Sequence, residues 1–198
     1  MKKIVLVVAL VAFLGAGTAF AEKPTGLGIG VVAGYGGLGS SAGTPLGISL
    51  KIPSVPLYWG LYFNLPMNLT KGYSAFGLGI TGDYMILQGD LVSSMNLGYY
   101  LGAGVFFDIY FQSYKETHLG SDVTGDRMDM AVGLRVPIGL TWMLAPAIEL
   151  FLDVGLGFGA QMQGEEEWKW GGSTLQKHES KIEFGFYYTG SLGVRFYL

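Results

Sequence analysis

Residues 28–33 read Gly-Ile-Gly-Val-Val-Ala, which fits the Gly-x-Gly-x-x-Ala turn that holds the pyrophosphate of a dinucleotide. Such a turn follows a buried strand, opens a helix and stands about 20 residues before an acidic residue. Residues 22–25 form no apolar strand, glycines continue through residue 39, and Lys51 stands near the expected acidic position. The sequence therefore predicts no cofactor at these glycines.

The two histidines, His118 and His178, are the other residues that could carry catalysis or bind a metal. Each stands among charged and hydroxyl-bearing residues, in a stretch typical of a loop. Neighbours on one loop rarely converge as nucleophile, base and orienting acid, and two distant histidines make a poor metal site. We predict no catalytic residue, no metal site and no enzymatic activity.

The elements that position the remaining polar residues alternate with a period of two. In residues 147–161 (AIELFLDVGLGFGAQ), the even positions are bulky and apolar, whereas most odd positions are small, with Glu149 and Asp153 among them. Successive side chains of a strand point to opposite faces, so one face is apolar and the other is small with embedded charges. The alternation occurs in eight segments: 26–35, 46–52, 57–64, 73–84, 97–111, 128–142, 147–161 and 184–198. The sequence thus predicts an all-β fold.

The glycine-rich face distinguishes between two kinds of barrel. In a soluble lipocalin-like barrel the apolar face points inward, whereas in an outer-membrane barrel it meets lipid and the small polar face lines the interior. A water-exposed strand face made mostly of glycine would weaken the strands without a packing gain. The narrow interior of an eight-stranded barrel, however, requires small residues between larger ones. We therefore predict an eight-stranded antiparallel up-and-down transmembrane β-barrel.

Aromatic residues on the apolar face are sorted by height, as in the girdles of membrane barrels. If the first strand starts at the periplasmic side, the lower strand ends carry Trp59, Tyr84, Trp142 and Phe196. The upper strand ends carry Phe63, Phe107, Phe111, Phe158, Phe184 and Phe186. A soluble core or sandwich has no reason for this sorting, so the girdles favour the membrane barrel.

Six charged residues stand at the alternate strand positions whose side chains point inward, in the lower and middle parts of the strands. They are Lys51, Asp83, Arg135, Glu149, Asp153 and Arg195. Across the hairpin at 143–146, Arg135 can face Asp153, and Arg195 lies at a height similar to Glu149. Buried charges are tolerated when they are paired and hydrogen-bonded. A conducting pore and a structural plug both fit this pattern, and the plug is favoured because side chains just fill an eight-stranded barrel.

Turn and loop lengths differ between the two ends. The turns at 53–56 and 143–146 are short and 85–96 is longer, while the opposite end carries the loops 36–45, 65–72, 112–127 and 161–183. Short periplasmic turns and long outer loops are typical of bacterial barrels. Trp168 and Trp170 lie in the longest loop, either as residues resting on the membrane surface or as a contact surface for an external protein or ligand.

The first 21 residues have the features of a secretory signal. Lys2 and Lys3 precede an apolar run that is too short to span a bilayer, and Ala19 and Ala21 suit cleavage. We predict a signal peptide at 1–21 and one barrel domain at 22–198. The chain has no cysteine, and its 12 basic and 15 acidic residues predict no nucleic-acid partner.

On these patterns the chain resembles the small eight-stranded bacterial outer-membrane proteins of the OmpX, OmpW and OmpA-transmembrane-domain type. Its last residues resemble the C-terminal insertion signal of such proteins through Gly193, Phe196 and Leu198, although that family usually ends in an aromatic residue. The resemblance implies location in the outer membrane, contact with its lipid, and recognition by the barrel assembly machinery.

Two functions follow as expectations. The first is an integral barrel with a plugged interior that serves envelope structure or surface interaction through its outer loops. The second is an OmpW-like narrow channel for small hydrophobic molecules, which would need an apolar lumen open to the side or top. Phe106, Tyr110 and Tyr187 point into the upper lumen, but so do Asp108 and several glycines, so the composition of the lumen fits neither expectation alone.

Overall fold

The structure is a computed structural model that describes residues 25–38, 43–66, 73–118, 121–170 and 173–198. The predicted signal peptide lies outside the described residues. The elements are β1 (Gly28–Leu38), β2 (Gly43–Ile52), β3 (Leu57–Pro66), β4 (Tyr73–Val92), the 3-10 helix η2 (Ser93–Met95), β5 (Leu97–His118), β6 (Ser121–Ala145), β7 (Ile148–Gln163), β8 (Glu166–Trp170), β9 (Ser173–His178) and β10 (Lys181–Tyr197).

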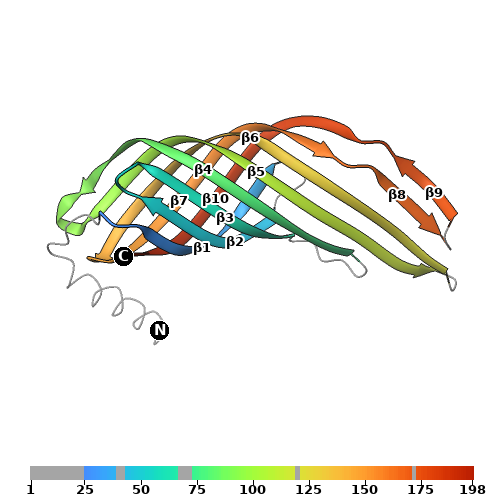
Figure 1. Ribbon diagram of the computed structural model, residues 1–198, viewed down its shortest axis with the longest axis horizontal. Coiled ribbons are helices and arrows are strands. Elements are labelled where there is room, and N and C mark those ends of the chain that lie inside the picture. Colours follow the sequence, from blue (N-terminus) through green and yellow to red (C-terminus); the bar gives the residue numbers. More distant parts are fainter. Residues whose placement is uncertain (1–24, 39–42, 67–72, 119–120, 171–172) are drawn as a thin grey trace, which may run out of the picture.

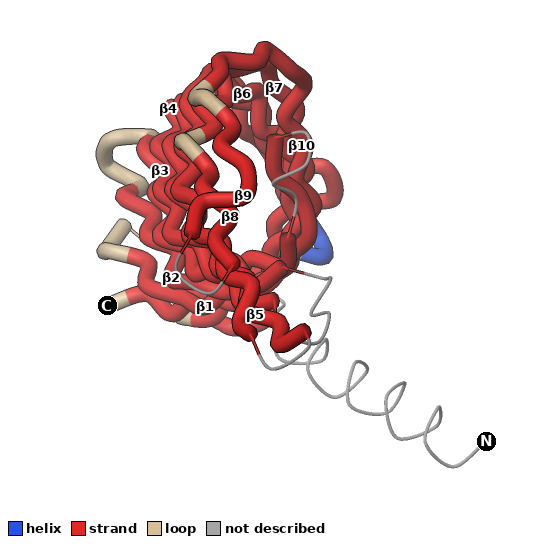
Figure 2. The backbone as a smooth tube through the Cα atoms, turned by 90° about the vertical axis from the view of Figure 1, so that its right-hand side faces the viewer, coloured by secondary structure: helices blue, strands red, loops and turns tan. Residues whose placement is uncertain are grey.

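Eight of these strands close into a ring in which all neighbours are antiparallel. Strands β1 to β7 pair in chain order, β7 pairs with β10, and β10 pairs with β1 (Figure 1). Figure 2, seen from the end that carries β8 and β9, shows the strands around the axis. The predicted eight-stranded antiparallel barrel is confirmed.

The strand register fixes the tilt of the barrel. The register can be traced from each residue to its partner on the next strand. Starting at Gly28 of β1, the trace passes Lys51, Asp83 and Arg135 and returns to β1 at Leu38, which is ten residues after Gly28. A shear of ten in a ring of eight strands tilts the strands by about 40° from the axis. This tilt lies in the range of outer-membrane barrels.

Glycines on the inner face make room for the large side chains that fill the lumen. A Cβ at Gly139 would overlap the ring of Tyr100, and a Cβ at Gly193 would overlap the ring of Phe151. Small residues between large ones are what a narrow barrel interior requires. The glycine content therefore follows from packing, and residues 28–33 belong to β1 and its inner face rather than to a cofactor turn.

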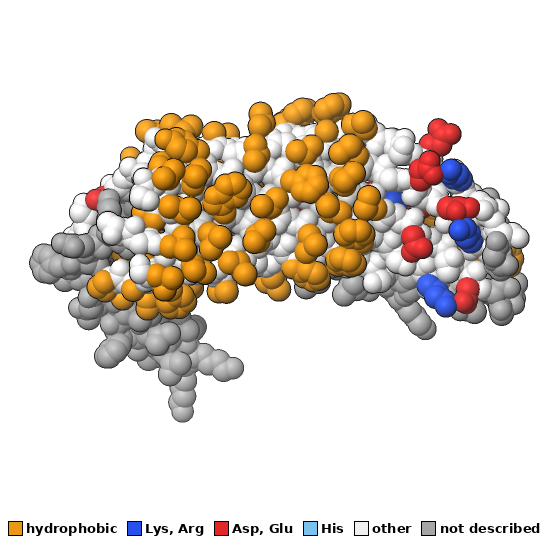
Figure 3. Space-filling view, in the orientation of Figure 1, with side chains coloured by type: hydrophobic (Ala, Val, Ile, Leu, Met, Phe, Trp, Pro, Cys, Tyr) orange, Lys and Arg blue, Asp and Glu red, His pale blue; other side chains and the backbone are white. Residues whose placement is uncertain are grey.

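The outer face of the ring is an apolar belt. Figure 3 shows hydrophobic side chains across the barrel wall, with charged side chains gathered toward the end that carries β8 and β9. The exposed side chains of this belt include Val31, Ile48, Leu61, Leu78, Val105, Leu134, Ile138, Val154, Leu156 and Leu192. Apolar surface of this extent is costly in water, and a closed ring is the form in which a β-sheet can cross a bilayer.

Several segments that were predicted as turns or loops contain strand residues. β4 continues through residues 85–92 and pairs with β5, with register shifts between Met85 and Leu87 and between Asp90 and Val92. Each shift inserts an unpaired residue, which interrupts the period-two pattern by which a strand is recognised. Residues 112–127 and 161–183 also contain strand, but one face there is charged and the other carries only a few aromatic residues, so their sequences carry little apolar alternation.

The barrel thus has two unlike ends. One end carries the turns at 53–56 and 146–147, the β4–β5 hairpin tip, Thr25 and the chain end Leu198; we name it the turn end. The other end carries the upper parts of β5 and β6 together with β8 and β9, which form a small sheet beyond the ring; we name it the extension end.

Candidate functional site

Two charged layers cross the lumen, and the lower one is centred on Glu149 of β7. Arg195 Nη1 lies 2.7 Å from Glu149 Oε1, and Lys51 Nζ lies 2.7 Å from Glu149 Oε2. The Tyr197 hydroxyl donates to Glu149 Oε2 at 3.0 Å, and Arg195 Nε donates to Ser49 Oγ at 2.8 Å. Side chains from three strands, β2, β7 and β10, therefore meet at one carboxylate and its two cations.

Aromatic rings complete the lower layer. The Arg195 guanidinium lies 3.7 Å from the ring centre of Phe151 and 4.8 Å from that of Tyr58. Lys51 Nζ lies 5.0 Å from the ring centre of Tyr58 and 5.6 Å from that of Tyr197. These cation–π contacts stabilise the two cations, of which Arg195 is buried and Lys51 is partly exposed.

The upper charged layer is centred on Arg135 of β6. Its Nη2 lies 2.8 Å from Asp153 Oδ1, and its Nε lies 3.3 Å from Asp83 Oδ1. The Tyr100 hydroxyl donates to Asp153 Oδ2 at 2.9 Å. The structure thus brings all six inward charges of the sequence analysis together in two layers, with Arg135 facing Asp153 and Arg195 facing Glu149.

An apolar cluster lies between the upper charged layer and the extension end. The rings of Phe106 and Tyr187 stack with centres 3.9 Å apart and planes 15° apart, and Leu38 and Ala131 complete the buried cluster. Above the lower layer, two cavities inside the lumen, lined by described residues, measure about 20 Å³ each, which is room for about one water molecule. Side chains therefore fill the lumen along most of its length.

Two further carboxylates of the inner face, Asp108 and Asp129, lie toward the extension end and are buried. Asp129 accepts hydrogen bonds from Gln112 Nε2 at 3.1 Å and from the Gly164 backbone N–H at 3.3 Å, and it lies 3.0 Å from Arg127 Nε. Neither carboxylate is among the six inward charges predicted from the sequence, although the same alternation places both side chains inside.

Asp129 therefore connects the barrel rim with the extension. Arg127 Nη1 also lies 3.6 Å from Glu166 Oε2 at the start of β8. The network joins β5, β6, the turn at Gly164 and β8, so it determines how the small sheet is attached to the barrel.

One face of the extension is aromatic. Tyr114 and Trp168 both pair with Gly125, and their rings approach to 5.1 Å with planes 53° apart. Trp170 follows on the same face and is exposed. The two tryptophans predicted to lie in a loop thus lie on a strand, because β8 pairs with the outer part of β6.

The opposite face of the extension is charged. It carries the exposed ion pairs Lys115–Asp122 (2.9 Å) and Lys169–Glu167 (3.1 Å). The Thr174 hydroxyl, followed by Lys169, holds the pKa of the Glu167 carboxyl below its ordinary value. Exposed pairs of this kind contribute little stability, and they keep this face soluble.

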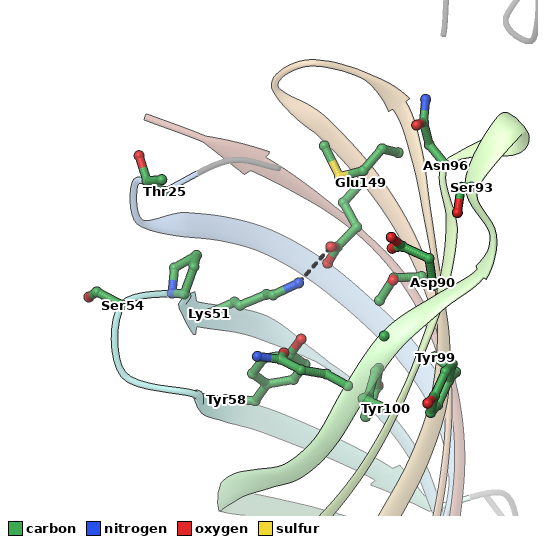
Figure 4. A pocket seen from close by; sticks show the side chains of 16 residues that line it. Thr25, Lys51, Ser54, Tyr58, Asp90, Ser93, Asn96, Tyr99, Tyr100 and Glu149 are labelled. Carbon is green, nitrogen blue, oxygen red and sulfur yellow. Dashed lines mark hydrogen bonds and ion pairs between the residues drawn. The ribbon is translucent and has the colours of Figure 1, made fainter. Parts of the chain in front are cut away.

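A cavity of about 670 Å³ opens at the turn end; we name it the vestibule (Figure 4). Its floor is the Lys51–Glu149 pair, where the side chain of Lys51 is 13% exposed and that of Glu149 only 2% exposed. The lining residues include Thr25, Ser54, Tyr58, Gln88, Asp90, Ser93, Asn96, Tyr100 and Thr141. This cavity is not predicted by the residue pattern, because residues 85–96 have the pattern of a turn.

The aromatic residues of the apolar face lie on the outside of the barrel. Toward the extension end, the ring of Phe76 stacks between those of Phe63 and Phe111, with ring centres 6.2 Å and 4.9 Å away. The ring centre of Phe158 lies 6.2 Å from that of Phe184 and 5.8 Å from that of Phe186. Phe107 on this face is also exposed. On the turn-end side, Trp59, Tyr84 and Phe196 are exposed and Trp142 is half-buried.

Residues of the predicted insertion signal lie at the end of the last strand. Phe196 and Leu198 are exposed, and the Leu198 backbone N–H donates to the Leu27 carbonyl at 3.1 Å. The structure therefore places these side chains on the outer surface of the seam between β10 and β1.

The two histidines lie on different strands at the extension end. His178 ends β9 and is exposed, and His118 ends β5, where its side chain lies outside the described part. Among the described side chains, no group of three acidic or histidine residues is arranged to hold a metal ion. Within the same residues, no helix is both long and apolar enough to cross a membrane.

The chain is similar to known proteins in fold rather than in sequence. No protein-family profile matches the sequence, and no curated protein is significantly similar to it. A major outer membrane protein from Thermus thermophilus shares 16% identity at a TM-score of 0.42, over 87% of this chain and 99% of that chain. Neisserial surface protein A (NspA) shares 16% identity at a TM-score of 0.42, over 89% and 100%. CarO from Acinetobacter baumannii shares 11% identity at a TM-score of 0.36, over 88% and 98%.

Proposed function

We propose that this outer-membrane β-barrel is a closed anchor that presents a small β-sheet to the exterior of the cell and does not act as a pore. The observation that carries the proposal is the filled lumen. Two charged layers and the stacked Phe106–Tyr187 pair block the axis in succession. A solute would have to displace buried ion pairs, and leaving either partner unpaired in the lumen is costly.

The orientation of the barrel follows from its two ends. Bacterial barrels have short turns on the periplasmic side and longer segments on the outside. The turn end is therefore assigned to the periplasm, and the extension end, with β8 and β9, to the cell exterior. In this orientation the aromatic face of Tyr114, Trp168 and Trp170 stands above the outer leaflet, where it is available to an external protein or ligand.

The alternative function, a narrow channel for small hydrophobic molecules, has less support. Such a channel needs a continuous apolar passage. Where the lumen is apolar, Phe106 and Tyr187 stack too closely for a solute to pass between them. Below this stacked pair, Arg135 and its carboxylates cross the lumen.

Planar-bilayer recording tests the closed lumen. The refolded chain is expected to give no stable unitary conductance, whereas a folded variant that truncates the stacked pair and both charged layers (Phe106→Ala, Arg135→Ala, Asp153→Ala, Glu149→Ala and Arg195→Ala) should give one. Stable unitary currents from the unaltered chain would overturn the proposal. Folding of both proteins is checked by heat-modifiable migration in gels, because a silent misfolded protein would otherwise count as a closed one.

We further propose that Gly193, Phe196 and Leu198 are read by the barrel assembly machinery. Phe196 and Leu198 are exposed at the seam that closes last in the chain. Phe196→Ala should lower the amount of assembled barrel in outer membranes, and Leu198→Phe should raise it, since the family usually ends in an aromatic residue. Equal assembly of both variants would contradict this role.

A further inference from the structure

The vestibule at the turn end is a blind cup. Tyr58, Met85 and Tyr100 form a buried cluster at its inner end, together with the Glu149–Arg195 pair. A solute that enters from the periplasm must leave by the same route. A cavity of this kind binds molecules rather than conducting them, and about 670 Å³ lies within the range of small-molecule sites.

One wall of the vestibule is longer than barrel closure requires. β3 pairs with β4 only as far as Leu57 and Tyr84, yet β4 runs on to Val92 before the chain turns. The other turns at this end reverse the chain in a few residues. Figure 4 shows this hairpin standing beside the floor pair.

The wall is polar only toward the cavity. Gln88 and Asp90 line the vestibule, whereas Leu87 and Leu91 are exposed on the outside. The two register shifts of β4 flank the stretch from Leu87 to Asp90, and the first, between Met85 and Leu87, brings these polar residues to the inner face. A hairpin that only connected β4 to β5 would not need a polar face toward the cavity and an apolar face toward the outside.

The chemistry of the lining favours an uncharged polar ligand. The Lys51 and Glu149 charges bind each other at the floor, and Asp90 has an interaction within the protein as well. The other polar groups include the neutral amide of Gln88 and the hydroxyls of Ser54, Ser93 and Thr141, while Asn96, like Asp90, already has a partner within the protein. Amides and hydroxyls both donate and accept hydrogen bonds, as the hydroxyls of a sugar do, whereas an apolar ligand would leave them unsatisfied.

We propose that the vestibule binds a saccharide of one or two rings from the periplasmic side. The amide of Gln88 and the hydroxyl of Thr141 contact the sugar hydroxyls, and the Lys51–Glu149 pair forms the floor beneath it. The sugar is either a free solute or the glycan of a cell-wall fragment, which share this chemistry. The inference rests on the closed lumen proposed above, and binding is measured independently of conductance, so either can fail alone.

The test is an NMR titration of the ¹⁵N-labelled chain in lauryldimethylamine-oxide micelles, a detergent without a sugar head group. The probes are maltose for a free sugar and N,N′-diacetylchitobiose for a cell-wall glycan. Saturable shifts are expected at Gln88, Ser93 and Asn96, and not at Trp168 or Trp170. Whichever probe binds more tightly identifies the source of the ligand.

Two variants probe the contacts without removing the wall. Gln88→Leu and Thr141→Val keep the side-chain shape while they remove the polar groups. Each should weaken binding by about three- to tenfold, the effect of one lost hydrogen bond. Gln176→Leu on β9 is the matched control and should leave binding unchanged.

Absence of saturable shifts with both sugars, in a protein whose heat-modifiable migration shows it folded, would overturn the proposal. So would equal weakening by Gln176→Leu and Gln88→Leu. Saturable binding of cyclohexanol at the same amides, in place of the sugars, would show an apolar site and would overturn it too.

Discussion

Arg195 of β10 and Glu149 of β7 are paired residues of adjacent strands, and their side chains meet in the lumen at 2.7 Å. Lys51 reaches the same carboxylate from β2 on the other side of β1. The pair therefore joins the last strand to a neighbour and, through Lys51, spans the seam between β1 and β10 that closes the barrel.

Replacing Glu149 by glutamine should destabilise the barrel strongly, because two cations would remain in the lumen with only a neutral partner. Loss of one partner of a buried ion pair costs about 3–5 kcal/mol. Urea unfolding in micelles measures the change. Lys181→Ala, which removes an exposed pair with Glu183, is the control and should change stability by less than about 1 kcal/mol. Equal effects of the two substitutions would mean that the lumen pair is solvated.

Arg135→Ala should leave both Asp83 and Asp153 without their cation and lower the thermal midpoint in micelles. The expected loss is again about 3–5 kcal/mol. Adding Asp153→Asn and Asp83→Asn to Arg135→Ala should recover part of it, since the remaining groups are neutral. A midpoint that Arg135→Ala leaves unchanged would argue against the pairing.

Much of this arrangement could be predicted from the sequence because a strand alternates its faces. The alternation alone predicts that the side chains of Arg135, Asp153 and Glu149 point inward and those of Leu134 and Leu152 outward, and the structure has them there. The alternation does not predict the height of a residue along the barrel axis or the register between strands. The convergence of Lys51 and Arg195 on one carboxylate therefore needed the ring to be closed.

Elsewhere the pattern was lost for physical reasons. After Met85 and after Asp90, one inserted residue reverses which positions of β4 point inward. The sequence of the vestibule wall therefore lacks a continuous alternation and resembles that of a turn. In β8, water meets both faces, so Glu167 and Trp168 alternate without an apolar period and the strand looked like a loop. The pairing of β8 with β6 is a long-range contact that no local pattern of residues encodes.

Gly139→Val and Gly190→Val form a matched pair on opposite faces of the wall. A Cβ at Gly139 would overlap the ring of Tyr100, whereas nothing lies within 4 Å of a Cβ at Gly190. Overpacking should make Gly139→Val about 1–3 kcal/mol less stable. Gly190→Val should be neutral or slightly stabilising, since valine favours strands. The two variants are compared by the folded fraction after refolding, which is measured from heat-modifiable gel migration. An equal loss of folded protein in both would show that the contact between Gly139 and Tyr100 does not determine stability.

Asp129→Ala should loosen the extension while the barrel stays intact. The substitution removes the acceptor of Gln112 and the Gly164 N–H and the partner of Arg127. Each unsatisfied buried group costs about 1–3 kcal/mol. Limited proteolysis of the protein in liposomes should cut β8 and β9 faster than in the unaltered chain, with unchanged heat-modifiable migration. Unchanged cleavage would mean that the pairing of β8 with β6 holds the sheet without this network.

Leu192→Arg and Ile182→Arg test the depth of the lipid-facing belt with two side chains of β10 that have similar exposure, 59% and 63%. Leu192 pairs with Ala33 and Leu152 between the two aromatic girdles, whereas Ile182 lies between the charged residues Lys181 and Glu183 beyond the upper girdle. An arginine at the bilayer midplane of a barrel costs about 2–4 kcal/mol, and one near the interface about 0–1 kcal/mol. Folding equilibria in phosphatidylcholine vesicles measure both. If the outer face met water instead, the two substitutions would have equally small effects, and the assignment of this face to lipid would be wrong.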